Sequence, residues 1–77
     1  MNEVIEIKVL DNYKIRIKFK DGFSKEIDFS QFISEGISQK LNDKDYFKLV
    51  EIESGGGITW PNGYDFCPNF LREIAEK

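Results

Sequence analysis

The stretch that decides the fold is YKIRIKFKDGFSKEIDF, residues 13–29. Apolar and polar residues alternate on both sides of Lys20-Asp21-Gly22, which is the pattern of two strands with one buried face. A two-residue turn would set Phe19 against Ser24 and mix the two faces. A three-residue loop closed by the glycine in left-handed backbone pairs Phe19 with Phe23 and keeps the faces separate. The pattern predicts an antiparallel hairpin with Ile15 opposite Ile27, Tyr13 opposite Phe29, Arg16 opposite Glu26 and Lys14 opposite Asp28.

The preceding segment, VIEIKVL (4–10), continues this alternation. We take Leu10-Asp11-Asn12 as its loop, because Asn tolerates left-handed backbone better than most residues. That loop predicts Val9 opposite Tyr13, Ile7 opposite Ile15, Ile5 opposite Ile17 and Glu6 beside Arg16, and so completes a three-stranded meander. Acids on both neighbouring strands would then flank the basic side chains of the middle strand. A phosphate-binding surface needs uncompensated cations, so we expect no direct binding to nucleic acid.

After Phe29 the strand pattern ends and a helical connector is expected. Ser30 is the predicted cap of a short helical turn over residues 30–37. Asn42 or Asp43 is the predicted cap of a second turn. The apolar residues expected to point inward from these turns are Phe32, Ile33, Ile37, Tyr46 and Phe47.

The alternation returns at residues 48–54 and predicts a strand with Val50 and Ile52 inward. Leu49 on its other face predicts that this strand is covered on both sides. The glycines 55–57 should reverse the chain into a partner strand over residues 58–60. The last segment should be a helix that begins at Pro68, a residue suited to the first helical turn. Its apolar face comprises Phe70, Leu71, Ile74 and Ala75.

These elements predict an α+β fold in one domain over residues 1–77: an antiparallel three-stranded β-meander, a short helical connector, a β-hairpin and a C-terminal helix. Composition agrees, since 40% of the 77 residues are hydrophobic, enough for a packed core. One cysteine and no histidine make neither an internal disulfide nor a zinc site, so we expect no metal and no cofactor. We expect a cytoplasmic chain without a signal peptide or membrane span. The oligomeric state stays open.

The segment ITWPNGYDF (58–66) contains the only Trp of the chain. Pro61, Asn62 and Gly63 suit the last three positions of a type I turn. We expect Trp60 to anchor this turn in the core and Asp65 to cap the last helix, since Cys67 is a poor capping residue. The alternative is that Trp60, Tyr64 and Asp65 form a binding site for a partner on a rigid turn.

An enzyme or small-ligand binder would have to use Asp65 as acid or base and Cys67 as nucleophile. The chain has no His to activate a thiol, and SGGGIT lacks the Lys and helix of a phosphate-binding loop. We therefore favour a non-catalytic protein-interaction module.

The segment ITWPNGYDFCPNFL resembles the C-terminal signature of a family of bacterial proteins, the domain-of-unknown-function family 2442. FKDGFSKEIDF resembles the Phe, Gly and Asp pattern of that family, and LNDKDYF resembles its connector. The resemblance covers nearly the whole chain. Its signature falls on Trp60, Pro61, Asn62, Gly63, Asp65, Pro68 and Leu71, while Tyr64, Phe66 and Cys67 depart from the usual residues.

This resemblance implies a small α+β domain, joined in longer relatives to a helix-turn-helix domain for which this chain has no room. It also implies that the gene lies beside that of another small protein. Such gene pairing suggests a couple of the toxin–antitoxin kind, with this family as the antitoxin. The expected partner is therefore another small protein chain, with Trp60, Pro61, Asn62, Gly63, Tyr64, Asp65 and Pro68 as the candidate contact or motif residues.

Overall fold

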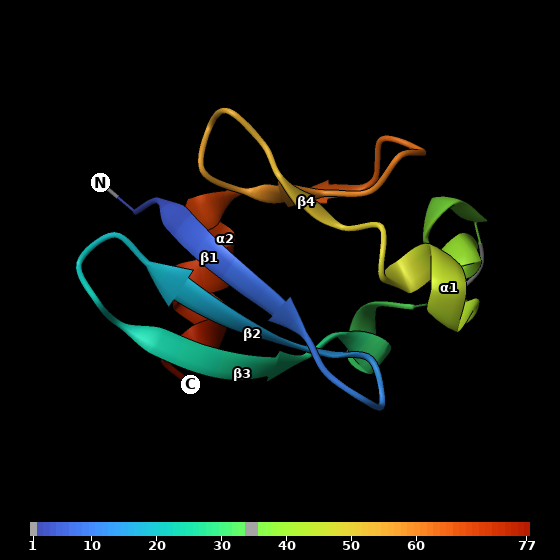
Figure 1. Cartoon of the computed structure of the whole chain (residues 1–77), viewed down its shortest axis with the longest axis horizontal. Coiled ribbons are helices and arrows are strands. Elements are labelled where there is room, and N and C mark those ends of the chain that lie inside the picture. The colour runs from blue at the N-terminus through green and yellow to red at the C-terminus, as the bar shows by residue number, and fades with distance from the viewer. Residues whose placement is uncertain (1, 34–35) are drawn as a thin grey trace.

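The fold consists of two three-stranded antiparallel sheets and a C-terminal helix (Figure 1). A computed structural model describes residues 2–33 and 36–77, apart from the side chains of residues 37 and 38. Sheet A has the strand order β1-β2-β3 and sheet B the order β4-β5-β6. The α+β class and the order of its parts are as predicted. The elements are β1 (Val4–Val9), β2 (Lys14–Phe19), β3 (Ser24–Asp28), the 3-10 helices η1 (Phe29–Phe32) and η2 (Gly36–Asn42), α1 (Lys44–Phe47), β4 (Glu51–Ile52), β5 (Ile58–Thr59), β6 (Asp65–Phe66) and α2 (Pro68–Ala75).

The register of the β2–β3 hairpin is as predicted: Ile15 lies opposite Ile27, Arg16 opposite Glu26 and Lys14 opposite Asp28. The amide of Phe19 donates to the carbonyl of Phe23, and the amide of Phe29 donates to Tyr13. The three-residue loop therefore keeps Ile15, Ile17, Phe19, Ile27 and Phe29 on one buried face.

The predicted register of the β1–β2 hairpin is wrong by two residues. Val9 lies opposite Ile15, not Tyr13, and Ile7 lies opposite Ile17, not Ile15. The predicted pairing of Ile5 with Ile17 is lost as well, because Ile7 takes that place. An irregularity between Val4 and Glu6 then sets Val4 opposite Phe19 and leaves Ile5 exposed. Glu6 lies opposite Lys18, and Lys8 takes the place beside Arg16.

The cause of this shift is the loop at Asp11-Asn12-Tyr13. Both Asn12 and Tyr13 have φ of 61°, in the left-handed region, so the turn closes one residue later than predicted. The amide of Leu10 donates to the carbonyl of Lys14, which begins the ladder. The Tyr13 hydroxyl donates to the carbonyl of Asn42, and its ring packs edge-on against Phe47. Contacts with the connector thus hold Tyr13 in this conformation.

The connector differs from the prediction in its first cap. Asp28, not Ser30, caps η1, because its carboxylate accepts from both the amide and the hydroxyl of Ser30. Asp43 caps α1 as predicted and accepts from the amide of Asp45. Phe47 is buried and Tyr46 half-buried. The predicted inward position of Ile37 lies outside what the structure describes.

Sheet B is shorter along β4 and wider than the predicted hairpin. β4 spans two residues, and Leu49, predicted to be covered, is 51% exposed. Ile52 is also exposed, while Val50 is buried as predicted. The glycine segment reverses the chain as predicted, and the turn after Trp60 leads into an unpredicted strand, β6, which pairs with β5.

Three of the hairpin loops share one geometry. In each, the residue before the loop bonds through its amide to the carbonyl four residues later, and its carbonyl accepts from the amide three residues later. Gly22, Gly56 and Gly63 are those third loop residues, all with φ between 89° and 96°. This is a type I turn followed by a left-handed residue, a conformation that favours glycine.

The core lies between the buried face of sheet A, the buried face of sheet B and α2. α2 lies behind sheet A in the view of Figure 1 and buries Leu71 and Ala75. Arg72 on this helix forms an ion pair with Asp21 at 3.0 Å, and its guanidinium lies 4.2 Å from the ring centre of Phe23. This contact joins the helix to the β2–β3 loop. At the other side of sheet A, the amide of Val4 donates to Gly56 and links the two sheets.

Candidate functional site

The turn at residues 60–64 has the predicted form. The amide of Gly63 donates to the carbonyl of Trp60 at 2.9 Å, and the amide of Trp60 donates to Tyr64 at 2.9 Å. The Asn62 side chain accepts from the amide of Tyr64. Pro61 is exposed at the tip of the turn. Because proline fixes its own φ angle, it restricts the backbone of this turn.

Trp60 is a core residue, as expected, and only 2% of it is exposed. Its indole N–H donates to the carbonyl of Phe47 at 2.9 Å. Its ring lies within 6.2 Å, centre to centre, of the rings of four neighbours: Phe29, Phe47, Tyr64 and Phe66. The indole of Trp60 is therefore too deeply buried to contact a partner protein directly.

Tyr64 is half-buried beside that ring cluster. Its hydroxyl donates to the carbonyl of Phe32 at 3.4 Å, and burial raises the pKa of its phenol. Pro68 is half-buried and is the first residue of α2, as predicted. Both side chains therefore contribute to the packing of the fold more than to an exposed contact surface.

Asp65 does not cap the last helix, contrary to the prediction. It lies on β6, opposite Thr59, and is exposed. Cys67 is the cap, because its Sγ accepts from the amide of Phe70 at 3.4 Å. A thiol placed directly before Pro68 thus serves where Ser or Asp is usual.

The carboxylate of Asp65 has an acidic neighbour, Glu53. The Glu53 carboxylate lies close over Gly57, which has no side chain: a Cβ on Gly57 would lie 2.9 Å from Glu53 Oε2. Burial raises the pKa of the Glu53 carboxyl. The negative charge of Asp65 and a side-chain hydrogen bond with Asp65 raise this pKa further. Sequence analysis missed this pair, because Glu53 and Asp65 are brought together only by the pairing of three strands.

A hollow of about 230 Å³ lies beside the turn. The exposed Leu49 and Pro61 are its apolar surface residues. The sequence does not indicate this hollow, because the alternating pattern predicts a covered Leu49. Its lining residues are Leu49, Glu51, Thr59, Trp60 and Pro61.

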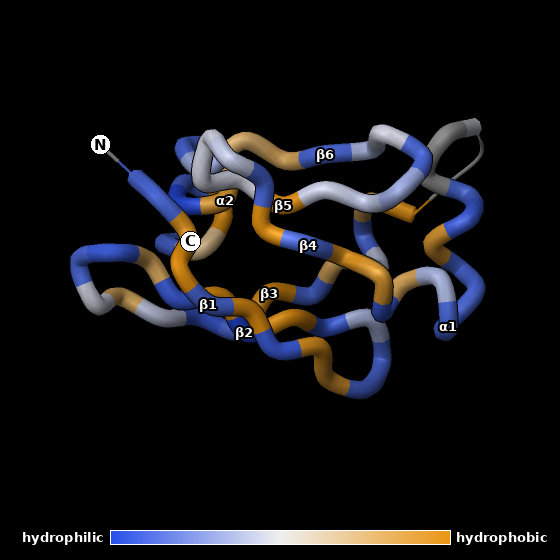
Figure 2. Tube along the Cα trace, turned by 45° about the horizontal axis from the view of Figure 1, so that its top comes forward, coloured by the Kyte–Doolittle hydropathy of each residue, from blue (hydrophilic) through white to orange (hydrophobic). Residues whose placement is uncertain are grey.

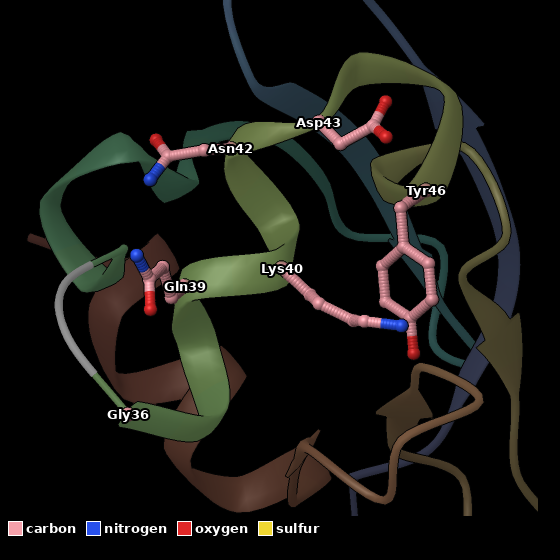
Figure 3. A pocket seen from close by; sticks show the side chains of 6 residues that line it. All are labelled: Gly36, Gln39, Lys40, Asn42, Asp43 and Tyr46. Atoms are coloured by element: carbon pink, nitrogen blue, oxygen red, sulfur yellow. The ribbon is translucent and has the colours of Figure 1, made fainter.

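A second hollow, of about 450 Å³, lies on η2 and α1 (Figure 3). In the close view, Lys40 extends toward the ring of Tyr46, with its ammonium 5.0 Å from the ring centre. The Asp43 carboxylate there is already engaged by the amide of Asp45. Its described lining residues include no Ser, Thr or Cys that could act as a nucleophile. The lining residues are Gly36, Gln39, Lys40, Asn42, Asp43 and Tyr46.

The outer face of sheet A carries mixed charge. Glu26 lies 3.9 Å from Arg16 and 4.0 Å from Lys14, and Glu6 lies 3.7 Å from Lys18. Lys8 lies opposite Arg16 and forms no ion pair among the described residues. The acids expected to flank the basic strand are therefore present, although the corrected register moves Glu6 from Arg16 to Lys18.

Among the described residues, no group of three or more His, Cys, Asp or Glu side chains could hold a metal ion. Within the same part of the chain, every helix is too short or too polar to cross a lipid bilayer.

Comparison with protein families gives one match. Residues 4–77 match the family described as "Protein of unknown function (DUF2442)". The chain belongs to this family. The residues that carry the resemblance lie on the turn at 60–64, on β6 and in α2. No curated protein and no solved structure gave a significant match to this DUF2442 chain.

Proposed function

We propose that this DUF2442 domain is a non-catalytic protein-interaction module that binds another small protein chain. The observation that carries the proposal is the hollow beside the signature turn, where Leu49 is 51% exposed next to Pro61. An exposed large apolar side chain beside a rigid turn is a typical anchor of a protein contact. The partner we propose is the small protein encoded beside this one, with this chain in the antitoxin role, in the cytoplasm.

Asp65 and Cys67, the two residues that an enzyme would have to use, make other contacts in this structure. The Cys67 thiol accepts a hydrogen bond from the start of α2, and Asp65 lies beside a second carboxylate. Neither arrangement supplies a base that would activate the thiol. These contacts support binding over catalysis.

Coexpression with the neighbouring gene tests the proposal, with the complex followed by size-exclusion chromatography and titration calorimetry. Leu49→Asp should abolish the complex, because it places a charge in the apolar hollow. Ile5→Asp is the matched control, since Ile5 is 43% exposed on sheet A, and it should leave binding unchanged. If the two chains do not associate, or if both variants bind like the original, the proposal is wrong.

A further inference from the structure

The outer face of sheet B is not covered by any other described element. In Figure 1 only the sheet's own connecting loops lie on the side away from α2, and Figure 2 turns this side toward the viewer. Its inward row is Ile52, Ile58 and Phe66, of which the latter two are buried. Because side chains alternate between faces, the neighbouring residues point outward. We call these outward residues, Leu49, Glu51, Glu53, Thr59, Pro61 and Asp65, the sheet B outer face.

The sheet B outer face is acidic at one end and apolar at the other. Three of its six residues are carboxylates, and no Lys or Arg is among them. Leu49 and Pro61 form the apolar end. The nearest cation in the sequence, Lys48, is the C-terminal cap of α1. The outer face of sheet A differs, because most of its acids are paired with cations there.

The carboxylates of Glu53 and Asp65 repel each other in the free domain. Glu53 is half-buried against Gly57 and Asp65, where its negative charge has no cation within the described residues. A cation supplied by a partner would remove this repulsion and would be drawn to this end of the face.

We infer that the occupant of the sheet B outer face is an extended basic segment of a partner protein, with one apolar side chain followed by Lys or Arg at alternate positions. The inference rests on the proposed function and specifies the partner's chemistry. Side chains on one face of an extended chain recur every second residue, about 6.8 Å apart. If the apolar residue of the segment lies in the Leu49–Pro61 hollow, the second residue after it lies beside Glu51 and the fourth lies beside the Glu53–Asp65 pair.

A second copy of this chain is not the occupant. Its sequence contains no apolar residue followed by Lys or Arg at both the second and the fourth position. Its basic run, residues 14–20, lies in the interior strand of sheet A and is already paired on both sides. The segment must therefore come from another protein.

The probe is the blocked peptide Ser-Leu-Thr-Arg-Thr-Arg-Ser, titrated into the isotope-labelled domain and followed by backbone NMR shifts. The shifts should concentrate on the sheet B outer face, and added salt should weaken binding. Replacing both Arg of the peptide by Glu should abolish binding. The double variant Glu51→Gln with Glu53→Gln should weaken it about fivefold. Glu26→Gln, on the outer face of sheet A, is the matched control and should bind like the original.

Shifts on sheet A, or equal affinity of the double variant and the control, would overturn the inference. The two proposals fail separately in the coexpression assay. If the neighbouring chain binds and needs Leu49 but tolerates the double variant, the basic segment is wrong and the interaction module stands. If the peptide binds this face and the neighbouring chain does not associate, the choice of partner is wrong and the chemistry of the face stands.

Discussion

Replacing Trp60 by Ala tests whether the signature turn is held by the core. The side chain is 2% exposed, contacts four aromatic rings and donates one hydrogen bond to Phe47. Truncating a large buried aromatic residue costs about 3 to 5 kcal/mol. The loss of its N–H leaves the Phe47 carbonyl with only the longer hydrogen bond from the Val50 amide, at 3.4 Å, and adds about 0.5 to 1.5 kcal/mol.

The domain has little stability to lose. At roughly 0.05 to 0.15 kcal/mol per residue, a chain of this size unfolds with about 4 to 12 kcal/mol. Trp60→Ala should therefore leave the chain largely unfolded at 25 °C. Trp60→Phe keeps a large ring but loses the N–H donor and part of the buried volume, and it should remain folded, with unfolding easier by about 1 to 3 kcal/mol.

Urea titration followed by circular dichroism measures both variants beside the original chain, and coexpression measures partner binding. If Trp60→Ala unfolds at the urea concentration of the original chain while partner binding disappears, Trp60 acts at the interface. That result would refute the assignment of Trp60 to the core.

Three further predictions concern the charged and reactive groups. The pKa of Glu53 is raised in the folded chain, so folding favours the protonated carboxyl. The stability that this carboxyl contributes is fully present below its unfolded pKa and is lost as pH rises through its folded pKa. Glu53→Gln should therefore be more stable than the original chain at pH 7 and gain less near pH 4, in urea titrations at both. Cys67→Ser should fold with similar stability, because Ser also caps helices, and Cys67 should alkylate like a model thiol at neutral pH; a much faster rate would revive the enzyme alternative. Binding to duplex DNA should be weak at physiological salt, and micromolar affinity with a steep salt slope would contradict the charge pairing on sheet A.

The sequence predicts the register of β2–β3 correctly because alternation excludes a one-residue error and Gly22 marks the left-handed position of the loop. The β1–β2 hairpin has no glycine to mark its loop. A shift of two residues keeps every side chain on its own face, so the hydrophobic pattern cannot distinguish Val9 opposite Tyr13 from Val9 opposite Ile15. The choice depends on Tyr13 adopting positive φ, which contacts with Asn42 and Phe47 stabilise. These contacts join residues far apart in the chain and leave no local sequence signal.

The candidate site is predicted less completely, for two reasons. β4 and β6 are two residues long, too short for alternation to reveal which side chains face solvent. The pattern therefore predicts a covered Leu49 and a helix cap at Asp65, and both predictions are wrong. The sequence does not indicate the cap at Cys67, because sulfur is a weaker hydrogen-bond acceptor than the oxygens of Ser, Thr, Asp and Asn, which are the usual caps. The position of Cys67, directly before a proline in the first helical turn, is nevertheless the usual position of a cap.

The signature residues divide into two groups once their contacts are known. Trp60, Asn62 and Gly63 each satisfy a need of the turn: a core anchor, an acceptor for the Tyr64 amide and left-handed backbone. Asp65 satisfies none, since its side chain faces solvent and lies beside Glu53, where it raises the pKa of that carboxyl. Folding alone would favour a neutral or basic residue here. The cation of the proposed partner would act on this side of the turn, where Asp65 lies beside Glu53.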